Sequence, residues 1–90
     1  MPQAIVDPEE LRRFAQSLRK FNTDIQERVT SLTGQMAALE RSWRDQEQKK
    51  FAEEFERQIQ VFARLIETID GHIPYLLRKS EIIEEYLQQR

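Results

Sequence analysis

The amino-acid sequence predicts an all-α protein built as one long antiparallel helical hairpin, a single domain over residues 1–90. Gly and Pro, which interrupt helices, account for only two and three of the 90 residues. Hydrophobic residues make up 39% and charged residues 33% of the chain, a balance typical of packed helices rather than of disordered segments. The hydrophobic residues also recur at steps of three and four, which is the period of one helix face.

The first helix is expected over residues 8–42. Asp7 is suited to cap its N-terminus, and Pro8 then occupies the first helical position, where a backbone N–H is not needed. Gly34 interrupts the helix and indicates a tolerated glycine, a close approach of another helix or a slight bend. The apolar positions that follow its start form one stripe: Leu11, Phe14, Leu18, Phe21, Ile25, Val29, Leu32, Met36, Leu39 and Trp43.

A turn over residues 43–45 leads to a second helix over residues 46–88, which Asp45 is suited to cap. Gly71 and Pro74 predict a kink or a short break near residues 70–74, because an interior proline loses one hydrogen bond and clashes with the preceding turn. The apolar stripe stays in phase across this stretch, which favours a kink. Its members are Phe51, Phe55, Ile59, Phe62, Ile66, Ile69, Ile73, Leu76, Ile83 and Leu87.

Two helices alone cannot cover stripes of this length. A helix of about 35 residues is about 50 Å long, and a hairpin has no third layer over its flanks. The exposed apolar patches would exceed those of soluble monomers. The sequence therefore predicts pairing with a second chain, either a copy of itself or a related protein, into a four-helix bundle. The residues expected in this core and dimer stripe are Leu11, Phe14, Leu18, Phe21, Ile25, Leu32, Met36, Leu39, Phe55, Ile59, Phe62, Ile66 and Ile69.

Several function classes find no support in the sequence. There is no cysteine to serve as a nucleophile or metal ligand, and the single histidine, His72, lacks the glutamate three residues earlier that metal sites in bundles use. The two isolated glycines cannot form a phosphate-binding loop. A net charge of −2 disfavours nucleic-acid binding. We therefore expect no catalytic residue, no cofactor, no metal and no nucleic-acid partner.

The N-terminal ten residues lack the basic start and the apolar stretch of a cleavable signal peptide. The longest apolar run, residues 73–77, is far shorter than a membrane span. We therefore expect a protein that is made in the cytoplasm and does not insert stably into a membrane. Any export would depend on a signal other than the standard one.

The only tryptophan, Trp43, lies at the predicted turn, and Phe51 follows eight residues later on the second helix. This layout resembles the WXG-motif family, the early-secreted-antigen-like substrates of type VII secretion. The family's turn reads Trp-x-Gly, whereas this turn reads Trp43-Arg44-Asp45. Aspartate is a reasonable substitute because it tolerates turn geometry and can cap the next helix. The resemblance implies a recognition site at Trp43, Arg44, Asp45 and Phe51, while the residues alone favour Trp43 as a plug at the end of the hairpin core.

The export signal of that family is a C-terminal Tyr-x-x-x-Asp/Glu, and neither tyrosine of this chain matches it. Tyr75 is followed four residues later by Lys79, and Tyr86 by Arg90. Three alternatives remain open: Tyr86 belongs to a divergent C-terminal signal, the chain travels with a partner that carries the signal, or it stays inside as a chaperone-like subunit.

The resemblance implies a non-enzymatic, type VII secretion-associated protein that acts through helix–helix dimerisation, as a secreted substrate, a co-secreted partner or an adaptor. Its implied partners are a second copy, a WXG-like paralogue and a type VII secretion ATPase. The alternative is a helical scaffold or oligomerisation module unrelated to secretion. Action on membranes is disfavoured because the polar faces are mixed in charge rather than basic.

Overall fold

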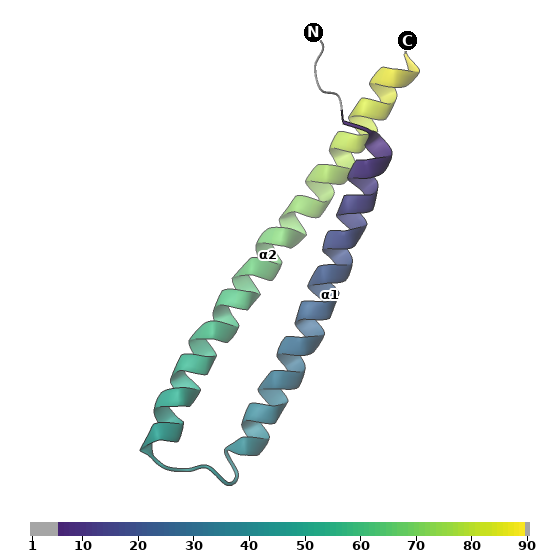
Figure 1. Ribbon diagram of the computed structural model, residues 1–90. Coiled ribbons are helices and arrows are strands. Elements are labelled where there is room, and N and C mark those ends of the chain that lie inside the picture. The colour runs from purple at the N-terminus through teal and green to yellow at the C-terminus, as the bar shows by residue number, and fades with distance from the viewer. Residues whose placement is uncertain (1–5, 90) are drawn as a thin grey trace.

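The computed structural model describes residues 6–89, which form two long α-helices joined by a short loop (Figure 1). Helix α1 spans Pro8–Leu39 and helix α2 spans Gln46–Gln88. The helices run antiparallel, and the start of α1 lies beside the C-terminal part of α2. The molecule is elongated, with extents of 69 × 21 × 15 Å. The predicted all-helical hairpin is therefore confirmed.

Both helices begin at the aspartates that the sequence indicated. The Asp7 side chain accepts a hydrogen bond from the backbone N–H of Glu9 at 3.0 Å, and Pro8 follows as the first helical residue. The Asp45 side chain accepts from the backbone N–H of Gln48 at 2.9 Å. Each carboxylate accepts a hydrogen bond from a backbone N–H that has no partner inside its helix. Its negative charge also interacts favourably with the positive end of the helix dipole.

Helix α1 ends at Leu39, three residues earlier than the sequence indicated, and the loop covers residues 40–45. The backbone N–H groups of Arg41 and Ser42 bond to carbonyls only three residues back, at 3.2 and 3.1 Å. Such bonds tighten the last turn of a helix and end it. The chain thus turns before Trp43, which lies in the loop rather than at the end of α1.

Helix α2 continues through residues 70–74, so the short break that Pro74 allowed does not occur. Pro74 leaves the carbonyl of Asp70 without its usual helical donor, but Asp70 is exposed, so water can bind there instead. A Cβ atom added at Gly34 or Gly71 would meet nothing within 4 Å. Helix α2 of the same chain therefore makes no close approach at Gly34.

The two helices meet along a narrow seam. Among residues 6–89, only four hydrophobic side chains are buried: Ala15, Met36, Ile66 and Ile73. Three polar residues are buried beside them: Asn22, Gln48 and Ser80. The sequence stripe places Phe14 and Phe21 in the core, but the residues that follow each of them, Ala15 and Asn22, occupy the seam instead. Small and polar side chains let the helices approach, and the two phenylalanines remain outside.

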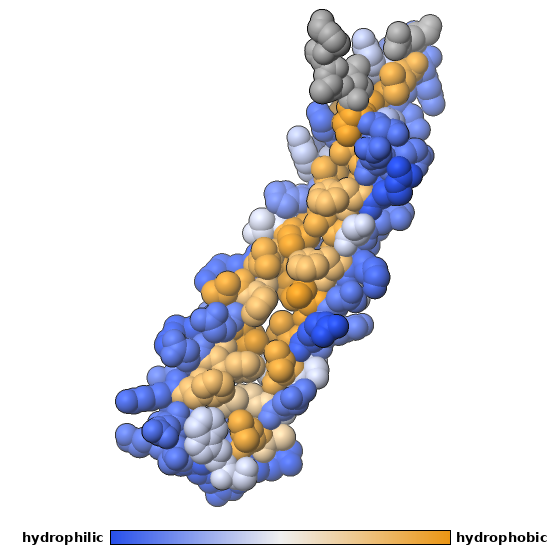
Figure 2. All heavy atoms as spheres, viewed as in Figure 1, coloured by the Kyte–Doolittle hydropathy of each residue, from blue (hydrophilic) through white to orange (hydrophobic). Residues whose placement is uncertain are grey.

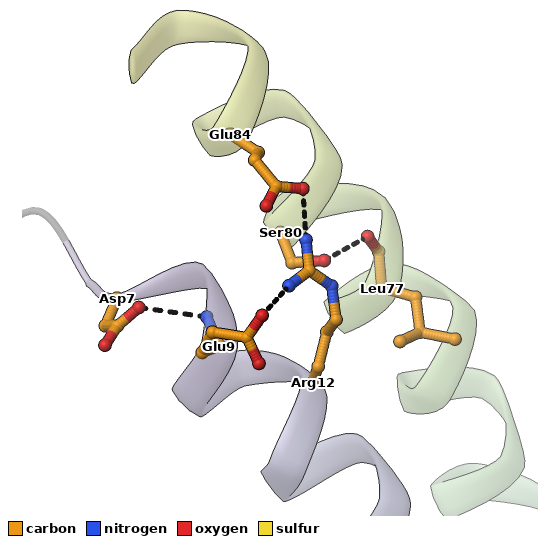
Figure 3. A network of polar contacts seen from close by, with 6 residues as sticks. All are labelled: Asp7, Glu9, Arg12, Leu77, Ser80 and Glu84. Atoms are coloured by element: carbon orange, nitrogen blue, oxygen red, sulfur yellow. Dashed lines mark hydrogen bonds and ion pairs between the residues drawn. The ribbon is translucent and has the colours of Figure 1, made fainter. Parts of the chain in front are cut away.

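Polar contacts join the two helices at two positions along the seam. In its middle, the Asn22 side-chain Nδ2 donates to the backbone carbonyl of Ile66 at 3.0 Å and to Asp70 Oδ1 at 2.8 Å. At the end of the hairpin away from the loop, Arg12 bonds to Glu84 of α2 and also to Glu9 Oε2, at 2.8 Å (Figure 3). Because a buried polar group forms its bonds in only one alignment of the helices, Asn22 fixes their register.

Candidate interaction surface

The helices leave a line of large apolar side chains uncovered on α1. Phe14, Phe21, Leu32 and Leu39 are 44–56% exposed. They are separated by seven, eleven and seven residues, and at about 100° per residue these steps return to within about 20° of the same direction. The four side chains therefore lie along one side of α1, next to the seam but outside it.

Helix α2 carries a matching line. Its members are Phe51, Phe62, Leu65 and Leu87, which are 39–47% exposed. On each helix, the line is rotated from the seam in the same sense about the helix axis. Because the two helices are antiparallel, both lines therefore face the same side of the hairpin. Figure 2 shows this side, where a band of apolar residues runs along the molecule with hydrophilic residues on either flank. We call these eight residues the open face.

The exposed area of the chain is large for its mass. It amounts to 7338 Å². A compact monomer of 10.8 kDa exposes about 5500 Å², which leaves an excess of roughly 1800 Å² in this hairpin. Two such chains would have about 3600 Å² to bury between them, and this lies within the range of obligate dimers, about 2000–5000 Å².

The residues predicted for the core and dimer stripe fall into three groups. Met36 and Ile66 are buried. The half-buried residues are Leu11, Leu18, Ile25, Phe55, Ile59 and Ile69. The exposed residues are Phe14, Phe21, Leu32, Leu39 and Phe62. The predicted stripe is thus divided between the hairpin's own seam and the open face.

Sequence reasoning missed the buried residues that are small or polar, namely Ala15, Asn22, Gln48 and Ser80. The positions of Ala15 and Asn22 could have been found, since Leu11, Ala15, Leu18, Asn22 and Ile25 follow each other at alternating steps of four and three. No residue type marks that line as a core, and only its spacing does.

The turn motif gathers an aromatic cluster at the closed end of the hairpin. The ring centroids of Trp43 and Phe51 are 5.7 Å apart, with their planes tilted by 39°. Phe51 in turn stacks on Phe55, at 6.2 Å and 22°. Trp43 is half-buried, while Arg44 is exposed. Because Phe51 also belongs to the open face, the cluster continues that face to the end of the molecule.

Asp45 stands where the Trp-x-Gly pattern has glycine, and the backbone there does not need one. Its φ and ψ angles are −89° and −174°, which is extended backbone open to any residue. No residue among 6–89 has a positive φ angle. The aspartate adds a helix cap that glycine would not provide through a side chain.

Both tyrosines lie within α2 and point into solvent. Tyr75 is 62% exposed and Tyr86 is 58% exposed. Lys79, four residues after Tyr75, is also exposed. Arg90, the residue four positions after Tyr86, lies outside the described residues, so the geometry of that C-terminal motif is described only as far as Gln89.

The described residues offer no metal-ion cluster of three His, Asp or Glu side chains. Neither helix, over the range that the structure describes, contains a segment apolar enough to span a bilayer. His72 is exposed on α2. The candidate functional sites among the described residues are therefore the open face and the aromatic cluster at the loop.

Comparison with known proteins gives a match to a protein family. The model of a family described as WXG100, proteins of 100 residues with WXG, matches residues 3–85. This range includes the loop with Trp43 and nearly all of both helices. No match is found among curated proteins or among solved structures.

Proposed function

Because the chain belongs to the WXG100 family, we propose that it is a secreted substrate, co-secreted partner or adaptor of a type VII secretion system. Membership implies an early-secreted-antigen-like helical protein that is associated with this system and is not an enzyme. In our proposal the chain acts by pairing with a second chain, and the two hairpins form a four-helix bundle.

The observation that carries this proposal is the open face. Eight large apolar side chains lie on one side of a hairpin that buries only four hydrophobic residues of its own among those described. An apolar surface of this length is unfavourable in water and is stable when a second hairpin covers it. A second copy and a WXG-like paralogue are the two partners that fit, since each would present a comparable face.

Recognition surfaces remain outside the bundle in this proposal. Arg44 is exposed beside the half-buried Trp43, and Tyr86 is exposed near the end of α2. Arg44 and the C-terminal part of α2 would therefore stay accessible to a secretion ATPase after the open face is covered. The chain would be made in the cytoplasm and exported without a cleavable signal peptide.

The test of pairing is the mass in solution, measured by light scattering on a size-exclusion column across a dilution series. The expected result is a mass of two chains, either for the protein alone or after co-expression with its paralogue. A fully helical one-chain species that unfolds cooperatively at low concentration would refute the pairing.

A scaffold unrelated to secretion is the second candidate, and the absence of Tyr-x-x-x-Asp/Glu after both tyrosines favours it. The two functions differ in one observable. A secretion-associated chain is found in the culture medium and disappears from it when the gene of the secretion ATPase is deleted. A scaffold is absent from the medium in both strains.

A further inference from the structure

A groove runs between the helices on the side away from the open face. Thr30 of α1 and Glu67 of α2 line it. Thr30 follows Phe14 of the open face by sixteen residues, and Glu67 follows Phe51 of the open face by the same number. Sixteen residues at about 100° each turn the helix by about 160°, so the groove opens to the opposite side. Two neighbouring hollows of 460 and 250 Å³ form it, and Ile59 lines both.

The groove has an apolar floor and acidic walls. Val29, Ile59 and Ile66 contribute to its floor. The charged residues that line the two hollows are Glu40, Glu56, Glu67 and Asp70, all of them acidic. We call it the acidic groove. Ala37, Ala52 and Ala63 also line it, and such small side chains allow another helix to approach closely.

A second surface, which presents two basic residues, lies on the outer edge of α2, with the exposed Glu81 and Glu85 on its flank. Tyr75, Ile82 and Tyr86 are 57–62% exposed and follow each other at steps of seven and four, which places them on one side of the helix. Arg78 and Lys79 lie between them, and neither forms an ion pair among the described residues. We call these five residues the basic edge.

Pairing through the open face would leave the basic edge uncovered. Tyr75 follows Phe51 by 24 residues, which turns it about 120° away from the line of the open face. The edge from Tyr75 to Tyr86 is about 17 Å long at about 1.5 Å per residue. The groove extends along α2 from Ala52 to Asp70, about 27 Å, so the edge fits within it.

We propose that the basic edge of one copy of this chain docks in the acidic groove of another, so that paired chains join into larger assemblies. Tyr75, Ile82 and Tyr86 would cover the apolar floor, while Arg78 and Lys79 would lie among the carboxylates that line the groove. The contact joins two different surfaces, so it repeats from copy to copy and forms rings or filaments. It uses neither the turn nor the open face and goes beyond the proposed function; Tyr86 would be covered in the larger assembly and accessible in the two-chain form.

The experiment is sedimentation velocity of the full chain, or of the chain with its paralogue, over a dilution series. The ionic strength is set to about 0.01 M or about 1 M, which shortens the screening length from about 30 Å to about 3 Å. At low salt the expected result is species larger than two chains, and at high salt they dissociate to the two-chain mass. A two-chain mass at every concentration and both salt levels would overturn the proposal.

Charge reversals test the two surfaces directly. Arg78→Glu with Lys79→Glu reverses the edge, and Glu56→Lys with Glu67→Lys reverses the groove. Each double variant should lose the larger species and keep its helicity and its two-chain mass, whereas a mixture of the two should form the larger species again. Loss without recovery in the mixture, or larger species that persist in either variant, would contradict the docking.

The matched control is Glu27→Lys, which reverses an exposed carboxylate on α1 outside both surfaces and should leave the assembly unchanged. Synthetic anionic vesicles serve as a second probe, since an aromatic and basic edge is also a surface that binds membranes. The proposal would be overturned by two results together: no self-assembly at low salt, and co-sedimentation with the vesicles that the double variant Arg78→Glu with Lys79→Glu abolishes. These results would assign the edge to lipid binding. In either case the two-chain mass still reports on the proposed pairing.

Discussion

Replacing Phe21 with alanine removes a large side chain from the open face without touching the seam. Phe21 is 45% exposed in the hairpin. A phenylalanine buries about 200 Å² when fully covered, so a partner would remove about 90 Å² of this side chain from water. At about 25 cal/mol per Å² the loss is about 2 kcal/mol for each chain. In a symmetric pair, which contains two copies, the loss reaches about 4 kcal/mol and raises the dissociation constant about 1000-fold.

The assay is the dissociation constant of the two-chain species, taken from light scattering over a dilution series at high ionic strength. Tyr75→Ala is the matched control, because it removes an even more exposed aromatic ring, at 62%, from a side of α2 away from the open face. Phe21→Ala should weaken the pair strongly and Tyr75→Ala should leave it unchanged. Equal effects of the two substitutions, or no effect of Phe21→Ala, would refute the assignment of the open face as the dimer interface.

Three further predictions concern single residues. Asn22→Ala removes the bonds to Ile66 and Asp70 and should lower the free energy of unfolding by about 2 kcal/mol, measured with urea; an unchanged midpoint would contradict the proposed tie. Asp45→Ala removes a cap and should cost about 1 kcal/mol, whereas Asp45→Gly, which restores Trp-x-Gly, should cost only a few tenths; equal losses would contradict the capping role. Tyr86→Ala should reduce the amount of protein in the culture medium but not in the cells, and unchanged export would exclude Tyr86 from the signal.

The ends of the helices could be predicted where a side chain acts on its own neighbours. Asp7, Pro8 and Asp45 satisfy or replace donors within a few residues, so their effect is visible in the sequence. The end of α1 is different, because the turn at Arg41 depends on bonds between backbone groups that no residue type marks.

The division of the stripe could not be predicted from its residues. Phe14 and Ala15 are neighbours, and either could face α2 within an apolar stripe as broad as this one. Apolar size favours Phe14 for the core, but close helix approach favours Ala15, and the structure places Ala15 at 1% and Phe14 at 56% exposure. The acidic groove was also out of reach, since it depends on how far apart the helices lie over residues 26–70.

The small core of the hairpin has a consequence for the abundance of the protein in the cell. Four buried hydrophobic side chains among residues 6–89 give a lone chain little protection against opening, and proteases cleave chains that open. A partner that binds only the folded hairpin adds its binding free energy to stability. Copies made in excess of the partner would therefore be degraded first, and the two amounts would stay matched through turnover, without any control of their synthesis.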